Sequence, residues 1–145
     1  MPKHHAGDQF MFQRAMQDME SETFSGPAYV STILEAENAA GAPSLHHVVF
    51  DEGVINNWHI HEEGQILLAT DGVGYHQIEG EPVQILHPGD VAFCTPGAKH
   101  WHGGSADTQF AHITINTNPE LTGLEWFDRI SPEEYGWLSA ETSQP

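Results

Sequence analysis

Short runs of apolar and β-branched residues, separated by turns, dominate the chain from residue 27 to residue 116. The turns are rich in glycine and proline, as in Asp71-Gly72 and in His87-Pro88-Gly89-Asp90. Many short strands at a spacing of about 8–12 residues, with no helical pattern between them, are typical of an all-β sandwich or barrel. The pattern predicts strands at 28–34, 45–50, 54–61, 65–70, 74–78, 82–86, 91–95, 100–103 and 109–116.

Helical patterns flank this β region on both sides. Residues 8–19 place apolar side chains at helical spacing behind Asp8, a candidate N-cap, and predict a short helix or arm. These side chains are Phe12, Ala15, Met16 and Met19. Near the other end, residues 131–134 supply a cap, a first-turn proline and a capping-box glutamate, which predict a helix through about Leu138. We therefore expect an arm or short helix at 1–23, one barrel domain at 24–138 and a disordered tail at 139–145.

Length and charge narrow the range of partners. The 145 residues are enough for one domain with a substantial core. Aspartate and glutamate number 21 against 4 lysines and arginines, so the net charge is −17. Nucleic acid and anionic membranes are therefore unfavourable partners, whereas a small molecule is not excluded. No apolar run approaches the ~20 residues that span a bilayer, and no signal peptide is recognisable, so we expect a cytoplasmic protein.

Two histidines one residue apart are the strongest candidates for chemistry. His59 and His61 lie in a predicted strand, where alternation points both side chains to the same face. Gln65 follows four residues later, and His100 follows after a further thirty-five. Three imidazoles and one amide oxygen would hold a divalent cation, with Mn, Fe, Ni or Zn compatible with such ligands. The alternative, a pair of surface histidines on a polar edge strand, is disfavoured by apolar neighbours on both sides.

These residues lie in two motifs that resemble the two motifs of the cupin superfamily. The first is Gly53-(five residues)-His59-Ile60-His61-(three)-Gln65-(six)-Gly72, and the second runs over residues 89–100. Gln65 stands where most cupins have glutamate, and the second motif has one extra residue. The resemblance implies a small double-stranded β-helix, or jelly-roll, barrel with a metal inside and a homodimeric assembly.

A narrower resemblance follows from Lys99-His100-Trp101-His102-Gly103 together with Gln65. The chain is similar, over roughly residues 24–138, to the small single-domain cupins called carboxymuconolactone-decarboxylase-like. That group includes manganese-dependent cupin hydroxynitrile lyases, so the resemblance favours manganese. It does not fix the reaction, because one fold hosts many activities.

Further histidines are candidates for proton transfer. His102 shares the face of His100 by strand alternation, and its ring is either a general acid/base or a residue at the rim. His112 matches a pocket histidine of the lyase-like cupins. If His112 faces inward, so does Asn116, which is shorter than the glutamine common in those relatives.

The remaining predictions concern the pocket wall and the core. His46 and Val48 share one strand face, which we expect to line the substrate pocket. The alternative places His46 outward at a dimer interface. Trp101 alternates with ligands and should face away from the metal, and Cys94, the single cysteine, should be a buried structural residue.

Three functions remain open on these residues. The leading hypothesis is a metal-dependent lyase or decarboxylase-like enzyme that acts on a small oxygenated substrate, with the metal as Lewis acid and histidines as acid/base groups. The second is an O₂-dependent dioxygenase, since three-histidine cupin sites also activate oxygen. The third is a non-catalytic cupin that binds a metal or a small ligand.

Overall fold

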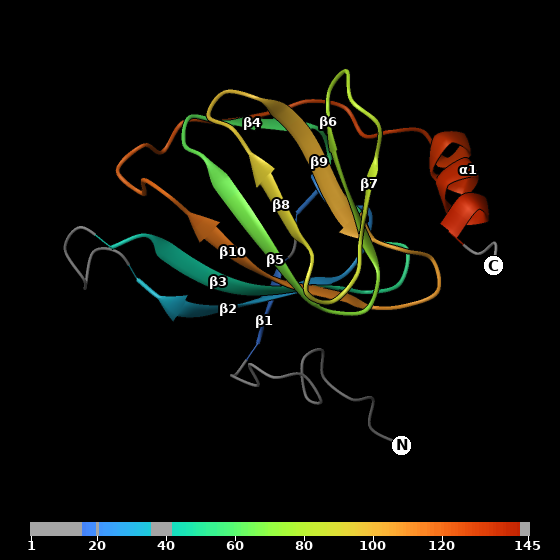
Figure 1. The fold of residues 1–145 in the computed structure, drawn as a ribbon, viewed down its shortest axis with the longest axis horizontal. Coiled ribbons are helices and arrows are strands. Elements are labelled where there is room, and N and C mark those ends of the chain that lie inside the picture. Colours follow the sequence, from blue (N-terminus) through green and yellow to red (C-terminus); the bar gives the residue numbers. More distant parts are fainter. Residues whose placement is uncertain (1–15, 20, 36–41, 143–145) are drawn as a thin grey trace.

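Two antiparallel sheets face one another in the computed structural model, which describes residues 16–19, 21–35 and 42–142 (Figure 1). One sheet has the order β1 (Gln17–Met19), β2 (Ala28–Leu34), β3 (Ser44–Phe50), β10 (Phe110–Asn116), β5 (Gln65–Asp71) and β8 (Val91–Cys94). The other has the order β11 (Leu124–Trp126), β4 (His59–His61), β9 (Lys99–Gly104), β6 (Gly74–Ile78) and β7 (Gln84–Leu86). A single helix among the described residues, α1 (Pro132–Thr142), lies at the side of the second sheet. The predicted all-β class is confirmed, and the arrangement is that of a jelly-roll whose two ladders remain separate.

The predicted strand at 54–61 is wrong in its first half. Only residues 59–61 form a strand, because the preceding backbone pairs with two different segments in turn. Ile55 bridges Gly103 of β9, whereas Asn56 bridges Phe24. A continuous ladder cannot form along a segment that changes partner at each residue.

Residues 8–19 were predicted to form a short helix or an arm, and the helix alternative is wrong where the structure describes this segment. Residues 17–19 form strand β1, which pairs with β2 from Gln17↔Val30 to Met19↔Ala28. Residues 8–15 lie outside the described part of the chain. Met19 packs against the core between the sheets. The hydrogen bonds between β1 and β2, together with this burial, outweigh the helical preference, which is weak in so short a segment.

The helix α1 begins as predicted and extends further. Ser131 Oγ accepts a hydrogen bond from the backbone N–H of Glu134 at 3.1 Å, which is the predicted N-cap contact. The helix ends at Thr142 rather than near Leu138, since residues 139–142 contain neither glycine nor proline to stop it. None of the helices described here is long and apolar enough to cross a bilayer.

Two apolar layers hold the sheets and the helix together. Between the sheets, Phe50 and Phe110 are fully buried and stack at a ring-centroid distance of 6.5 Å. Behind the second sheet, Trp101 and Tyr75 are fully buried under α1. Trp101 therefore faces away from the sheet interior, as its alternation with His100 predicted.

Close approach of the two sheets depends on a glycine in β6. A Cβ added at Gly74 would overlap the ring of Phe110 in the facing sheet. By contrast, Gly72 and Gly80 serve the predicted turns and have positive φ values of 71° and 85°.

We expect Gly74→Ala to lower the free energy of unfolding by about 1–3 kcal/mol, because the added methyl overpacks the space beside Phe110. Gly136→Ala is the matched control. Gly136 lies inside α1 with open space around its Cα, so the same change should raise the free energy of unfolding by about 0.5–1 kcal/mol. Urea unfolding of the three proteins measures both effects. A Gly74→Ala protein as stable as the original would show that this contact does not limit the sheet separation.

Candidate metal centre

Three imidazoles converge where β4 lies beside β9. His59 and His61 project from the same face of β4, and His59 is the direct cross-strand partner of His100 on β9. The rings of His59 and His100 are 4.2 Å apart between centroids. One ligating nitrogen from each of the three histidines lies within 4.8 Å of the others, so one ion could bind all three.

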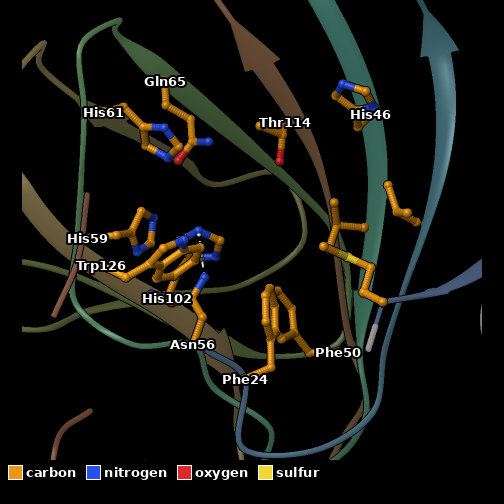
Figure 2. A pocket seen from close by; sticks show the side chains of 13 residues that line it. Phe24, His46, Phe50, Asn56, His59, His61, Gln65, His102, Thr114 and Trp126 are labelled. Carbon is orange, nitrogen blue, oxygen red and sulfur yellow. Dashed lines mark hydrogen bonds between the residues drawn. The ribbon is translucent and has the colours of Figure 1, made fainter. Parts of the chain in front are cut away.

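Gln65 reaches the same place from the facing sheet. It is the first residue of β5, and Figure 2 shows its side chain next to that of His61. The amide Nε2 donates to Asn116 Oδ1 at 3.4 Å, which leaves Oε1 as the atom turned away from that contact. Oε1 is buried and has no hydrogen-bond partner, so it is available as a fourth ligand.

The donor set fits a divalent transition metal. His59 donates from Nδ1 to the backbone oxygen of Asn57 at 2.8 Å, so its Nε2 keeps a lone pair. His100 Nε2 is buried without a hydrogen-bond partner, which is costly unless a ligand or ion occupies that position. Imidazole nitrogens with one amide oxygen suit Mn, Fe, Ni or Zn.

Burial keeps these rings in the form that binds metals. Loss of hydration lowers the pKa of His59 to about 4 and holds the pKa of His61 below its usual range. Burial, followed by repulsion from neighbouring imidazoles, also depresses the pKa of His100. The three ligand candidates are therefore neutral near pH 7, as coordination requires.

A fourth imidazole at the site, that of His76, was not predicted from the sequence. It lies on β6 with 3% of its surface exposed, and its Nε2 is 3.1 Å from Nδ1 of His100. The sequence indicated only that His76 lies in the predicted strand 74–78. The spacing of residues along the chain did not predict that this strand pairs with the strand of His100. The structure supplies the pairing, which sets His76 opposite His102 and Ile78 opposite His100.

Cys94 is buried beside this pair, as predicted. Its Sγ lies within 4.8 Å of ligating nitrogens of His76 and His100. The thiol points at two backbone oxygens, those of Thr95 at 3.8 Å and Ala98 at 3.7 Å. Burial raises the pKa of Cys94 to about 11, so the sulfur stays protonated.

His102 lies on the metal-facing side of β9, and Asn56 holds it in place. The backbone N–H of His102 donates to Asn56 Oδ1 at 2.9 Å, and Asn56 Nδ2 is 3.2 Å from Nε2 of the ring. Since the amide oxygen is already an acceptor, Nδ2 donates and Nε2 accepts. Neutral His102 therefore carries its proton on Nδ1, which is buried and has no hydrogen-bond partner.

His112 is fully buried, although its match to a pocket histidine of the lyase-like cupins predicted a place in the pocket. Its ring packs edge-on against His102 at 5.3 Å and stacks on Phe50 at 5.8 Å. Nδ1 lies 3.1 Å from the hydroxyl of Thr114, and burial lowers the ring's pKa to about 3. His112 thus stands behind Thr114 and Phe50, and Asn116 contacts Gln65; neither is among the residues that line the pocket.

A pocket of about 280 Å³ opens beside the histidines. It is lined by Met19, Phe24, Val30, His46, Val48, Phe50, Asn56, His59, His61, Gln65, His102, Thr114 and Trp126 (Figure 2). His46 and Val48 line this pocket, and Figure 2 shows His46 across it from His59; that the pocket receives a substrate stays a prediction. The pocket therefore has a polar end at the histidines and a largely apolar wall made by aromatic and aliphatic residues.

Comparison with known proteins shows which family has this architecture. The model of the cupin domain family matches residues 46–116, which include all four ligand candidates. An (R)-mandelonitrile lyase of Granulicella tundricola is 33% identical over 115 residues, which cover 79% of this chain and 87% of that protein. A cupin-like protein from Thermotoga maritima superposes with a TM-score of 0.79 at 37% identity, over 86% of this chain and 93% of the other.

A polyketide cyclase of Streptomyces resistomycificus shares the fold alone, with a TM-score of 0.67 at 12% identity over 100% of this chain and 95% of that one. The mandelonitrile lyase and the Thermotoga protein are each 33% or more identical to this chain over most of its length. This chain belongs to the cupin family.

Proposed function

We propose that this cupin is a metal-dependent lyase that acts on a small substrate with an oxygen function at one end and an apolar group at the other. The observation that carries the proposal is the meeting of three neutral imidazoles and a buried amide oxygen at the end of a largely apolar pocket. The Granulicella relative, a mandelonitrile lyase, supports it. Mandelonitrile has this polarity: a hydroxyl-bearing carbon joined to an aromatic ring.

The metal would be held by His59, His61, Gln65 and His100, and manganese is the first choice among Mn, Fe, Ni and Zn. When bound, it supplies Lewis acidity toward a substrate oxygen. All four ligands are neutral, so they leave the full charge of the ion available for that purpose. The apolar wall would receive the other end of the substrate and exclude water from the reacting carbon.

His102 is the proposed proton-transfer group. Asn56 fixes its tautomer, and the Nδ1 proton has no protein partner. His112 backs Thr114, whose hydroxyl lines the pocket, and would act through that hydroxyl. The homodimer and the cytoplasmic location inferred from the sequence remain predictions.

The amide of Gln65 should matter for turnover more than for metal retention. Gln65→Glu adds a carboxylate, so we expect one Mn²⁺ per chain, bound at least as tightly, with slower cleavage of mandelonitrile because one unit of the ion's charge is neutralised. Metal content and cyanide release are measured together. Gln84→Glu on exposed β7 makes the same change in net charge away from the site and controls for it. Equal turnover at full occupancy would show that the amide is incidental.

Removal of the His102 imidazole should slow turnover with little loss of metal. His102→Ala is expected to reduce the rate of mandelonitrile cleavage to benzaldehyde and cyanide ~10²–10⁴-fold, which is the usual contribution of a general acid/base. His87→Ala changes an exposed histidine and should leave the rate unchanged. Oxygen uptake by the iron-loaded protein, without cleavage, would favour the dioxygenase alternative. Tight metal binding with neither activity would favour the non-catalytic one.

A further inference from the structure

A hydrogen bond between two buried imidazoles lies directly behind the candidate metal centre. His76 of β6 and His100 of β9 have 3% and 0% of their surfaces exposed. Their closest nitrogens, Nε2 of His76 and Nδ1 of His100, are 3.1 Å apart. His76 thus occupies Nδ1 of His100 and leaves Nε2, which is buried without a hydrogen-bond partner, for an ion.

The direction of this hydrogen bond follows from what Nε2 of His100 must do. A neutral imidazole has one N–H, and the nitrogen that binds a metal must be the other one. Coordination through Nε2 therefore requires His100 to carry its proton on Nδ1. In that state Nδ1 donates and His76 accepts at Nε2.

We propose that His76 is a positioning residue that holds His100 in the metal-binding tautomer and ring orientation. The inference rests on the proposed metal site and adds a residue for which neither the motifs nor the comparisons give a role. It concerns this chain's own side chain and does not make His76 a ligand.

Comparison with His59 shows why a side chain is needed at this place. His59 satisfies the same requirement with the backbone oxygen of Asn57 at 2.8 Å. The Nδ1 of His100 instead faces the neighbouring strand β6, where it meets the imidazole of His76 at 3.1 Å. An apolar residue at position 76 would leave the His100 N–H buried without that acceptor, and the binding tautomer would lose its advantage.

A second metal ion held by His76, Cys94 and His100 is the competing reading of the same cluster. Their ligating atoms also lie within 4.8 Å of one another. The thiol of Cys94, however, points at the backbone oxygens of Thr95 and Ala98, which are acceptors for S–H and unfavourable neighbours for a thiolate. One ion with a supporting His76 is therefore favoured over two ions.

The test compares His76→Leu with His76→Gln in Mn²⁺ titrations of the metal-free protein. Leucine keeps most of the volume and removes the acceptor, so we expect Mn²⁺ affinity to fall by about 10–100-fold. Glutamine offers an amide oxygen as acceptor and should restore most of the loss. His47→Leu removes an equally buried imidazole from the other sheet and should leave the affinity unchanged.

Thermal unfolding of the metal-free proteins separates positioning from a merely structural role. His76→Leu should unfold at a somewhat lower temperature, because the buried N–H of His100 loses its acceptor, but it should be fully folded at the temperature of the titration, so that a loss of affinity does not come from unfolding. Nitrogen NMR of the Zn²⁺-loaded original protein gives a reading that needs no variant: His76 should carry its proton on Nδ1 and accept at Nε2.

Each contrary result has its own meaning. Failure of the original protein to bind Mn²⁺ or Co²⁺ would overturn the proposed function and this inference with it. Normal binding by His76→Leu, or an Nε2 proton on His76, would overturn this inference alone. A Co²⁺ complex with two ions per chain and a thiolate charge-transfer band that Cys94→Ser abolishes would establish the second metal site instead.

Discussion

The removal of water from a group of imidazoles is the constraint on which the rest of this structure depends. Between the two sheets, His59, His76, His100, His102 and His112 are all buried. A buried imidazolium is costly, so the rings are neutral and each offers one donor and one acceptor. One nitrogen of each ring is hydrogen-bonded. The partner is a backbone oxygen for His59, an amide for His102 and a hydroxyl for His112, whereas His76 and His100 contact each other. What remains is a small set of buried polar atoms without partners, including His100 Nε2, His102 Nδ1 and Gln65 Oε1.

The fold keeps these atoms in place by using both faces of one strand. β9 carries His100 and His102 toward the facing sheet and Trp101 toward α1. The indole Nε1 of Trp101 donates to Gln77 Oε1 on β6 at 2.9 Å, so the outer layer ties together the two strands that bring His100 and His76 into contact. Packing under the helix and the geometry of the histidine cluster are therefore coupled through a single strand.

Sequence predicted the parts of the site that follow from local periodicity. Alternation along one strand placed His59 with His61, His100 with His102, and Trp101 on the reverse side, while turn glycines fixed the limits of the strands. The missing information was of three kinds. β1 exists because of its ladder with β2, and a three-residue strand has no periodicity to detect. The role of His76 depends on the pairing of β6 with β9, a contact between segments that no local pattern links. The depth of His112 depends on Phe50 and Thr114, because strand parity gives the face of a residue but not its distance from the opening.

Electrostatics connects the site to the composition of the chain. The residues that line the pocket include no aspartate or glutamate, although the chain has 21 of them. Its acidic surface would repel polyanions, whereas an ion held by four neutral ligands would make the pocket locally positive. Under the proposed function, a substrate oxygen that gains negative charge as its proton is removed would be stabilised by the ion, since no lysine or arginine is among the residues that line the pocket. Because His46 lies across the pocket from the histidine ligands, a substrate long enough to touch both would present its oxygen to the metal end and its apolar body to Phe24 and Phe50. The neutrality of the proposed ligand set, rather than the presence of a metal-binding motif, is thus the property that would let an ion polarise a substrate in a chain so acidic.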